Sequence, residues 1–588
     1  MEHNTLNSLE RAKAWANNPA FDESSRKEVQ NLIDNENHKE IEERFYRDLE
    51  FGTGGMRAIL GQGTYRLNKY NIRKASQAVA LSVLENNPKE PKIAISYDSR
   101  NYSFEFAKVA AEVFAANGIK ALIFKFLNPV PLCSFAIRYH KCNAGVMVTA
   151  SHNPPEYNGF KVFWSDGAQV TPPNDQNIIS KFNQITDYNS IPYMPFVEGE
   201  EKGLISWIDE DTRKHYFAAI KENSLGLEEC QKYGDELKVV YTALHGTGWE
   251  PCSRALNDLG LKNILSVKEQ QEPDGSFPTV SSPNPENPEA LELAVNLMKE
   301  ENADIAMGTD PDTDRVGVAL IHNGEVEYIN GNQIGILMLH YTCSRYKNSG
   351  KMPGHPYFVK TIVTTDLQSK IAEKFGVKTE NTLTGFKWIC GKVEEISKED
   401  PKRTFIFGTE ESFGYLNHSE VRDKDGVASV ALMAEIALHY KRKGMNLIQA
   451  LDAIYEEFAF SHEKLLSLNY YGKEGAEKIQ RIMESFRHYD KEELCGQKIE
   501  SLSDFSNNSV KNFQTGNLKD LGFPPSNVLG FTFTNGNKLF LRPSGTEPKI
   551  KFYIMIQAND GSLEEKKKDS YQLSDTMINF ITEWSNNI

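Results

Sequence analysis

Short apolar runs that end in polar, glycine-containing segments recur along the chain. KIAISYDSR (residues 92–100), IKALIFKFL (119–127) and AGVMVT (144–149) are typical of buried strands, and a helical pattern covers 103–116. The alternation restarts at LKVVYTALHGTG (237–248) and ADIAMGTDPDTDR (303–315). It restarts again at PYFVKTIVTT (356–365), with a helical pattern near 367–375 before RTFIFGTEESFGY (403–415). This order predicts three similar α/β units whose sheets are parallel or mixed.

The two ends of the chain have different patterns. Residues from about 4 to 87 are predicted to be helical, interrupted by a glycine-rich turn at FGTGGMRAILGQG (51–63). Near the other end, alternating strands flank an Asn-Gly turn in FTFTNGNKLFLRPSGTEPKIKFYIMIQA (531–558), and a helical tail covers about 563–584. We therefore expect four domains around a central cleft, at 1–203, 204–325, 326–465 and 466–588, the last a smaller α+β domain.

Composition and charge exclude several classes of protein. A formal net charge of −15 argues against a general nucleic-acid binder, although it allows a local basic pocket for a small anion. No stretch reaches the run of about 20 apolar residues that a membrane helix needs, and the polar N-terminus resembles no signal peptide. The seven cysteines are scattered, which is typical of reduced thiols. These features predict a cytoplasmic enzyme, a monomer or dimer, that binds neither membrane nor nucleic acid.

An acidic loop, GTDPDTDR, follows one of the apolar strands. Asp310, Asp312 and Asp314 alternate along it, and carboxylates this close repel one another unless a cation lies among them. Oxygen ligands on a tight loop suit Mg²⁺. An EF-hand is excluded, because its sixth and twelfth positions need Gly and Glu, and here they hold Arg315 and Ile321. The alternative is a solvated acidic turn.

Three further loops carry groups that suit a sugar phosphate. RPSGTEP offers phosphate donors: a guanidinium, two hydroxyls and a backbone freed by glycine, from Arg542, Ser544, Gly545 and Thr546. FGTEESFGY places Glu410 and Ser412 where they can bind sugar hydroxyls. In TLTGFKW, Lys387 follows a glycine turn and can approach a phosphate. Taken alone, the last two loops are explained nearly as well by a capped turn and a solvated lysine.

Ser151 and His152 lie on a rigid loop between two apolar runs, in AGVMVTASHNPPEYNGFKVFW (144–164). Their adjacency does not make a hydrolase triad, because neighbouring side chains at a strand end point in different directions. No G-x-S-x-G motif surrounds Ser151. With a metal loop on the next unit, we expect the serine to carry a phosphoryl group whose charge Mg²⁺ neutralises.

Together these motifs resemble the α-D-phosphohexomutase superfamily of phosphoglucomutases and phosphomannomutases. TASHNP, DPDTDR, EES and RPSGTEP all occur in the family's order, and matching segments extend from FGTGGMR to the last motif. TLTGFKWI and the insertion between Gly414 and Gly426 are most similar to the branch that combines phosphoglucomutase and phosphopentomutase activities. The resemblance implies an isomerase that interconverts glucose 1-phosphate and glucose 6-phosphate through a bisphosphorylated sugar, with Mg²⁺ as cofactor and glucose 1,6-bisphosphate as intermediate and activator.

The resemblance also implies a role for each motif residue. Ser151 is the phosphorylated serine and joins Asp310, Asp312 and Asp314 in the metal shell. The residues implied near the phosphoserine are Arg57, His152 and Lys161, of which the last two are candidates for the general base. Those implied to bind the substrate are Arg315, Lys387, Glu410, Ser412, Arg542, Ser544, Gly545 and Thr546.

One position departs from the family pattern, and other functions stay open. Many members have Gly directly after Glu-x-Ser, whereas this chain has Phe413. This difference puts the identity of the sugar in doubt, so phosphopentomutase and phosphomannomutase activities are alternatives. A phosphatase of the haloacid-dehalogenase type, with an aspartate nucleophile, is another, although Asp314 stands where that family has a hydroxyl residue. A sugar-phosphate-binding protein without activity is the non-enzyme alternative.

Overall fold

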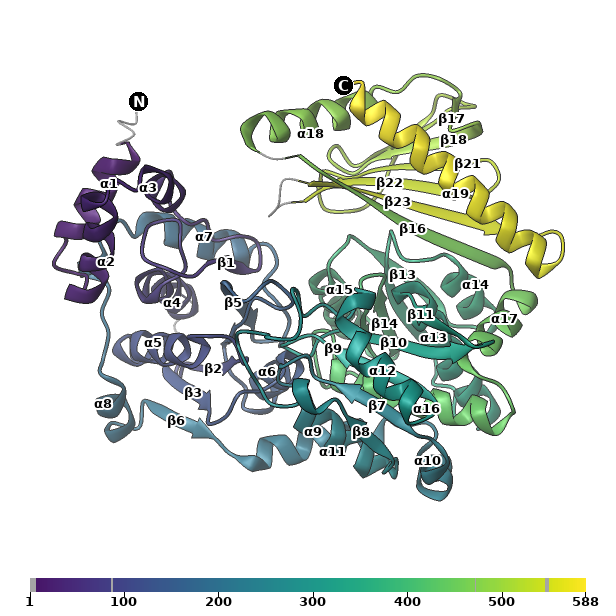
Figure 1. Cartoon of the computed structure of the whole chain (residues 1–588), viewed down its shortest axis with the longest axis horizontal. Coiled ribbons are helices and arrows are strands. Elements are labelled where there is room, and N and C mark those ends of the chain that lie inside the picture. Colours follow the sequence, from purple (N-terminus) through teal and green to yellow (C-terminus); the bar gives the residue numbers. More distant parts are fainter. Residues whose placement is uncertain (1–6, 86–87, 471, 545–548) are drawn as a thin grey trace.

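The structure is a computed structural model that describes residues 7–85, 88–470, 472–544 and 549–588. Four β-sheets, each with its own helices, follow one another along the chain (Figure 1). In Figure 1 the first unit is at the left and the fourth, with its long helix α19 (Leu563–Asn586), is at the upper right. The three similar α/β units and the C-terminal α+β unit that the sequence predicts are confirmed.

The first sheet has six strands in the order β1-β5-β4-β2-β3-β6. The strands β2, β4, β3 and β6 are parallel, while β5 runs antiparallel to both β4 and β1. Their bounds are β1 Gly55–Ile59, β2 Lys92–Tyr97, β3 Lys120–Phe124, β4 Ala144–Val148, β5 Tyr157–Trp164 and β6 Ile205–Ile208. The helices that belong to this unit are α4 (Lys69–Leu84), α5 (Ser103–Ala116), α6 (Val130–Tyr139), α7 (Asn174–Gln184) and α8 (Phe196–Glu201). The helix predicted at 103–116 is confirmed by α5.

Strand β1 corrects the prediction of a turn within 51–63. Its five residues pair with β5, so the glycine-rich segment forms an edge strand of the sheet. Gly55 has a φ of +134°, and a Cβ at this position would lie 1.9 Å from the carbonyl oxygen of Phe160. The glycines that suggested a turn are thus needed for close backbone approach at the sheet edge.

The second and third sheets repeat the same plan. The second has the order β11-β10-β9-β7-β8, and the third has the order β13-β12-β14-β15. Strand bounds are β7 Val239–Thr242, β8 Ile264–Ser266, β9 Ile305–Thr309, β10 Val316–His322, β11 Glu325–Ile329, β12 Pro356–Thr361, β13 Lys378–Thr382, β14 Thr404–Glu410 and β15 Gly414–Leu416. The longer helices are α9 (Glu210–Glu222), α11 (Trp249–Leu259), α12 (Glu292–Glu300), α13 (Gly331–Asn348), α14 (Leu367–Lys374), α15 (Phe386–Glu399), α16 (Gly426–Arg442) and α17 (Leu447–Glu457).

A shared feature of these three units positions the site. In each sheet a strand with a parallel neighbour is followed directly by an antiparallel strand, as in β4–β5, β9–β10 and β14–β15. The connections between them are the serine loop, the acidic loop and the Glu-Glu-Ser loop. Polar groups at the carboxyl ends of parallel strands lie outside the sheet, where open α/β folds bind ligands.

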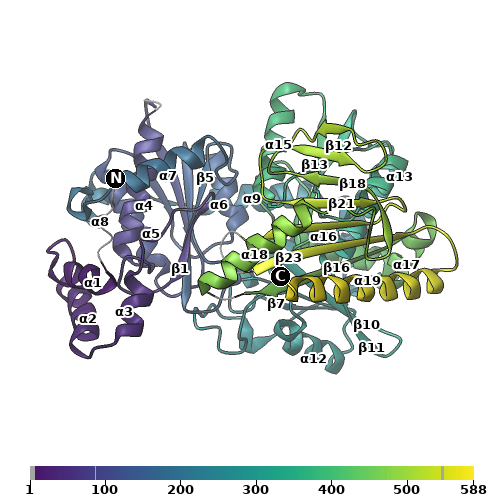
Figure 2. The ribbon, with the colours of Figure 1, turned by 90° about the horizontal axis from the view of Figure 1, so that it is seen from above.

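The fourth sheet is antiparallel, with β16-β23-β22-β21-β18-β19-β20 in order. The Asn-Gly hairpin is confirmed, because Asn535 and Gly536 connect β21 to its partner β22. Helix α19 confirms the helical tail and packs on β16 and β23 with α18 (Gly472–Arg487) nearby (Figure 2). Strand bounds are β16 Phe460–Asn469, β18 Gln497–Asp504, β19 Ser509–Asn512, β20 Leu518–Asp520, β21 Leu529–Phe533, β22 Lys538–Pro543 and β23 Lys549–Ala558.

The sheets change over near the predicted domain boundaries, though not at them. Strand β6 pairs with β3 in the first sheet, two residues past the boundary expected at 203. Strand β11 pairs with β10 across the boundary expected at 325, and β16 already belongs to the fourth sheet before 466. These edge strands are partly exposed, so the sequence marks their membership poorly. The division into four domains itself stays a prediction.

Three short helices precede the first sheet: α1 (Ser8–Asn17), α2 (Glu23–Asp34) and α3 (His38–Phe45). They bury a small aromatic cluster of their own around Trp15, Phe21 and Phe45. Within the residues that the structure describes, no helix is both long enough and apolar enough to cross a bilayer.

Candidate functional site

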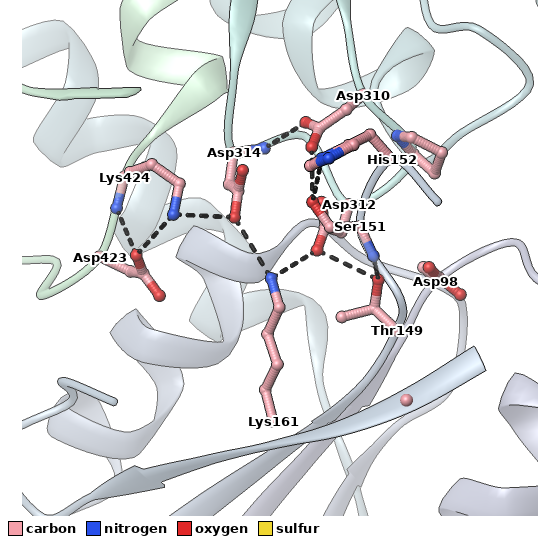
Figure 3. A network of polar contacts seen from close by, with 12 residues as sticks. Asp98, Thr149, Ser151, His152, Lys161, Asp310, Asp312, Asp314, Asp423 and Lys424 are labelled. Carbon is pink, nitrogen blue, oxygen red and sulfur yellow. Dashed lines mark hydrogen bonds and ion pairs between the residues drawn. The ribbon is translucent and has the colours of Figure 1, made fainter. Parts of the chain in front are cut away.

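The serine loop and the acidic loop meet between the first and second units (Figure 3). Ser151 Oγ donates to Asp310 Oδ2 at 3.0 Å and lies 3.3 Å from His152 Nδ1. Thr149 Oγ1, at the start of the serine loop, donates to Asp312 Oδ2 at 3.1 Å. The backbone N–H of Val130 also donates to the carbonyl oxygen of Asp312, at 2.9 Å. The two loops that the sequence separates by 159 residues are therefore in direct contact.

Arg100 stabilises the conformation of the serine loop by donating hydrogen bonds to its backbone. Ser151 has a φ of +54°, in the left-handed region that non-glycine residues rarely adopt, and it is 3% exposed. The Arg100 guanidinium donates to the carbonyl oxygens of Ser151, Pro154 and Tyr157 at 2.6, 2.9 and 2.9 Å. Arg100 pairs in turn with buried Asp98, at the end of β2. This support fixes the direction of the Ser151 hydroxyl.

The three aspartates form a buried cluster that suits a divalent cation. One carboxylate oxygen from each of Asp310, Asp312 and Asp314 lies within 4.8 Å of the others, and all three residues are at most 1% exposed. Among the described residues, Oδ1 of Asp312 and Oδ1 of Asp314 accept no hydrogen bond although both are buried. Buried carboxylate oxygens without donors are costly, and a hard cation would satisfy them. The donor set thus fits Mg²⁺.

Electrostatics at the cluster are strongly asymmetric. Burial and repulsion from Asp314 and Asp312 raise the pKa of Asp310 well above its usual range. Burial would also raise the pKa of Asp314, but Lys424 and Lys161 lower it instead. Lys161 Nζ donates to Asp312 Oδ2 at 2.7 Å and to Asp314 Oδ2 at 3.3 Å. Several buried carboxylates held close together, as these three are, are characteristic of functional sites.

Lys424 is a site residue that the sequence reasoning missed. Its ammonium lies 3.2 Å from Asp314 Oδ2 and 3.4 Å from Asp423 Oδ1, and the residue is 7% exposed. Attraction to Asp314, Asp423 and Glu410 raises the pKa of Lys424 despite its burial. Lys424 lies in the 417–425 loop after β15, within the insertion noted between Gly414 and Gly426. The signal in the sequence that could have identified Lys424 is the Lys-Asp-Gly run that leads into α16.

The 417–425 loop is fastened by a buried histidine. His418 Nε2 lies 3.0 Å from Asp425 Oδ2, and Nδ1 lies 3.1 Å from Glu420 Oε2. Tyr216 OH donates to Asp425 Oδ1 at 2.9 Å, which ties the loop to the second unit. Burial alone would lower the pKa of His418, but its hydrogen bonds to Asp425 and Glu420 raise it to about 9.

This arrangement predicts a pH-dependent contribution to stability. The charged form of His418 is favoured in the folded state, so its contribution is complete below the unfolded pKa of about 6.5 and is lost as pH rises through 9. The rise in the pKa of His418 from 6.5 to about 9 corresponds to a contribution of roughly 3 kcal/mol to the free energy of unfolding. We expect His418→Gln to unfold several degrees below the parent at pH 6, and the gap to narrow by pH 10. Thermal unfolding of both proteins between pH 6 and pH 10 tests this prediction. A difference in unfolding temperature that stays constant over this range would contradict a charged His418.

The Glu-Glu-Ser loop of the third unit approaches the acidic loop. The backbone N–H of Val316 donates to the carbonyl oxygen of Phe413 at 3.2 Å, and Phe413 has a φ of +61°. Glu410 is 4% exposed, and burial raises its pKa to about 7 although Lys424 opposes the rise. Ser412 is partly exposed on the same loop. Arg315 pairs with Glu286 and, through its backbone N–H, donates to Asp310 Oδ1 at 3.0 Å.

The remaining predicted residues surround this centre. Arg57 Nη1 donates to Asn153 Oδ1 in the serine loop at 2.8 Å. Lys387 Nζ donates to the carbonyl oxygen of Thr53 at 3.0 Å, so it connects the third unit to the first. Arg57 lies on β1, Lys161 on β5 and Lys387 near the start of α15, whereas Ser151, His152 and the three aspartates lie on the loops that connect the strands.

Strands β22 and β23 of the fourth unit flank the phosphate loop. Arg542, one residue before the end of β22, pairs with Lys551 in β23, and the N–H of Ser544 donates to the carbonyl oxygen of Lys549 at 2.8 Å. Burial lowers the pKa of Lys551, while Glu286 and Glu411 oppose the change, so this strand lies within electrostatic reach of the sugar loop. Gly545 and Thr546 lie outside the described residues.

Comparisons with known proteins agree with this architecture. Models of the α/β/α domains I, II and III of phosphoglucomutase/phosphomannomutase match residues 48–189, 214–323 and 330–458. A phosphoglucomutase of Staphylococcus epidermidis is 35% identical over 532 residues, covering 90% of this chain and 95% of the relative. One of Staphylococcus aureus strain MRSA252 is also 35% identical, covering 89% and 93%.

Solved structures share the fold. Parafusin, a phosphoglucomutase from Paramecium, superposes with a TM-score of 0.67 at 17% identity, covering 92% of this chain and 96% of that one. A phosphoglucomutase/phosphomannomutase family protein from Burkholderia thailandensis gives 0.60 at 18% identity, covering 89% and 96%. With three domain models in order and relatives above 30% identity over nearly the whole length, the chain belongs to the phosphoglucomutase/phosphomannomutase family of phosphosugar mutases.

Proposed function

We propose that the chain interconverts glucose 1-phosphate and glucose 6-phosphate, with Ser151 as the residue that carries the phosphoryl group. The observation that carries the proposal is the Ser151 hydroxyl, 3.0 Å from Asp310 at the edge of the buried aspartate cluster. The similarity to named phosphoglucomutases over 90% of the chain supports glucose as the sugar.

The reaction has two phosphoryl transfers. In the first, the 6-hydroxyl of glucose 1-phosphate attacks the phosphorus of phospho-Ser151. The bond from phosphorus to Ser151 Oγ breaks, and the hydroxyl proton passes to a base. The product, glucose 1,6-bisphosphate, reorients within the site. Ser151 Oγ then attacks the phosphorus at the 1-position, the bond from phosphorus to O1 breaks, and the base returns its proton to O1. This leaves glucose 6-phosphate and restores phospho-Ser151.

Asp310, Asp312 and Asp314 would hold Mg²⁺ beside Ser151. When bound there, the cation supplies positive charge that stabilises the transferring phosphoryl group. Lys161 and Lys424 add fixed positive charge on the other side of the aspartates. Positioned charge of this kind supplies most of the rate gain in phosphoryl transfer.

His152 is the better of the two base candidates. Burial, with the nearby charges of Arg315 and Arg57, lowers the pKa of His152 well below its usual value, so the imidazole is neutral, as a base must be, and would hold an accepted proton only weakly. Its Nδ1 lies 3.3 Å from Ser151 Oγ. Lys161 is held in its charged form by Asp312 and Asp314, which raise its pKa despite burial, and so suits electrostatic stabilisation.

Substrate binding is assigned to Arg315 of the second unit and to residues of the third and fourth units. Glu410 and Ser412 would bind sugar hydroxyls, and Arg315 and Lys387 would contact sugar or phosphate. Arg542, Ser544, Gly545 and Thr546 would bind the phosphate that is not reacting. This one phosphate-binding loop must therefore bind either phosphate of the bisphosphate. Closure of the fourth unit over the sugar would protect phospho-Ser151 from water.

Activity itself is the first test of this function. Glucose 1-phosphate with Mg²⁺ and a trace of glucose 1,6-bisphosphate should yield glucose 6-phosphate, measured by a coupled dehydrogenase. The same assay with ribose, deoxyribose and mannose phosphates, compared by kcat/KM, decides among the phosphopentomutase and phosphomannomutase alternatives. No product from any of the four sugars would support a binding protein instead.

Gly414 gives a test of the role of Lys424. A Cβ at Gly414 would lie 2.2 Å from Lys424 Cδ, so the lysine needs the space that glycine leaves. We expect Gly414→Ala to displace the ammonium and to lower kcat/KM by about 10- to 100-fold. The control is Gly391→Ala in α15, where a Cβ meets nothing within 4 Å. Equal activity of the two variants would show that Lys424 has no part in turnover.

A further inference from the structure

A second cavity, of about 350 Å³, lies far from the Ser151 site, at the outer end of the first unit. It is open on one side and is lined by residues of α1, α4, the end of α7 and the segment after α3, elements that Figure 1 shows at the left of the molecule. Its volume is that of a small-molecule site. The residues on which the argument depends are Arg11, Trp15, Asp48, Lys74, Phe182 and Tyr188.

Lys74 is the unusual member of this cavity. It is only 8% exposed on α4, yet within the described part of the chain its ammonium has no hydrogen bond and no ion pair. The Lys74 Nζ atom lies 4.4 Å from the centroid of the Phe182 ring. Burial lowers the pKa of Lys74 and the charge of Asp48 opposes the change, so an acid acts on the ammonium without forming an ion pair with it. An anion held in the cavity would supply a direct partner.

The acidic groups nearby are already engaged. Asp48 pairs with Arg11, which also donates to Thr64 Oγ1 at 2.9 Å. Glu50 pairs with Arg47 at 3.3 Å. Neither acid forms an ion pair with Lys74, although the charge of Asp48 acts on it. Both acids lie at the cavity and would repel a second negative charge. A ligand with one negative charge therefore suits the cavity better than a phosphate dianion.

The walls of the cavity are aromatic. Trp15 and Phe182 are 3% and 1% exposed, and Tyr188, whose hydroxyl donates to Asn71 Oδ1 at 2.8 Å, completes the lining. Trp15 is stacked on Phe21 with ring centroids 3.9 Å apart, which fixes the indole. Rigid aromatic faces beside one cation favour a planar ligand body with an acidic group at its edge.

We propose that this cavity binds a small aromatic carboxylate, with its carboxylate on the Lys74 ammonium and its ring against Trp15 and Phe182. The site shares no residue with the Ser151 centre, so it is independent of the sugar-phosphate chemistry. Ligand binding supplies the buried lysine with the charge-assisted hydrogen bond that it lacks in the free protein.

Fluorine NMR of the full chain labelled with 6-fluorotryptophan tests the proposal. Trp15→Phe assigns the Trp15 resonance among the six tryptophans. Benzoate is the probe, benzamide its neutral counterpart and phenyl phosphate its dianionic one. We expect benzoate to shift the Trp15 resonance saturably below about 20 mM, with benzamide and phenyl phosphate weaker. No saturable shift with benzoate, or equal binding of either comparison compound, would overturn the proposal.

Lys74→Met keeps the length of the side chain and removes its charge. We expect it to weaken benzoate binding by roughly tenfold or more, since a hydrogen bond to a charged group is lost. Lys69→Met is the matched control, because Lys69 lies on the same helix but pairs with Asp22 outside the cavity. Unchanged mutase activity in both variants shows that they are folded. An unchanged benzoate affinity in Lys74→Met would overturn the role of the lysine.

Discussion

Ser151→Ala is expected to lower kcat by at least about 10⁴-fold, because the hydroxyl that accepts and returns the phosphoryl group is gone. The variant should still bind glucose 1-phosphate, since the residues assigned to the sugar and to its distal phosphate lie on other units. Steady-state kinetics give the first quantity, and calorimetric titration with glucose 1-phosphate gives the second.

The matched control is Ser99→Ala, which lies between Asp98 and Arg100 and has no assigned part in the site. The Ser99 hydroxyl is buried and has no hydrogen-bond partner among the described residues, so its removal should leave kcat nearly unchanged. Undiminished turnover in Ser151→Ala would refute the covalent role of this serine. Loss of sugar-phosphate binding in the same variant would instead indicate a disturbed loop.

Asp312→Asn should produce the second large effect. The change keeps the size of the side chain but removes one of the three carboxylates of the buried cluster. The Oδ1 atom of Asp312 accepts no hydrogen bond among the described residues. We expect a weaker apparent affinity for Mg²⁺ and a fall in kcat/KM of at least about 100-fold. Activity measured as a function of Mg²⁺ concentration separates the loss of Mg²⁺ affinity from the fall in kcat/KM.

Metal removal complements this variant. Treatment of the parent enzyme with EDTA should abolish activity, and added Mg²⁺ should restore it. Asp274→Asn, at an exposed aspartate of the same unit, should respond to Mg²⁺ like the parent. Full activity of the parent in EDTA would contradict a metal-dependent mechanism, and an unchanged Mg²⁺ response of Asp312→Asn would remove Asp312 from the metal site.

Much of this site could be predicted because its residues lie in short, contiguous loops. Asp310, Asp312 and Asp314 are close in sequence and repel one another, so their function is visible without a fold. Ser151 stands on a loop between two buried strands, and the end of a strand beside a parallel neighbour is where α/β folds place ligands. Local sequence therefore predicted the loops and the structure brings them together.

Lys424 and Arg100 could not be predicted in the same way. Lys424 lies in a long loop whose path depends on His418, Asp425 and Tyr216, residues from two units that meet only in the folded chain. Arg100 acts through backbone carbonyl oxygens of another loop, and such contacts leave no pattern in the sequence. Strand β1 was missed for a similar reason, because its glycines reflect a neighbouring strand.

The most direct test of the central claim is to follow the phosphoryl group itself. Enzyme mixed with glucose 1-phosphate bearing ¹⁸O in its non-bridging phosphate oxygens is quenched within a few turnovers, and its peptides are analysed by mass spectrometry. The account predicts that the labelled phosphoryl group appears on Ser151, in an acid-stable linkage. Formation of glucose 6-phosphate with no label on Ser151, or with the label on an acid-labile aspartyl group, would contradict it.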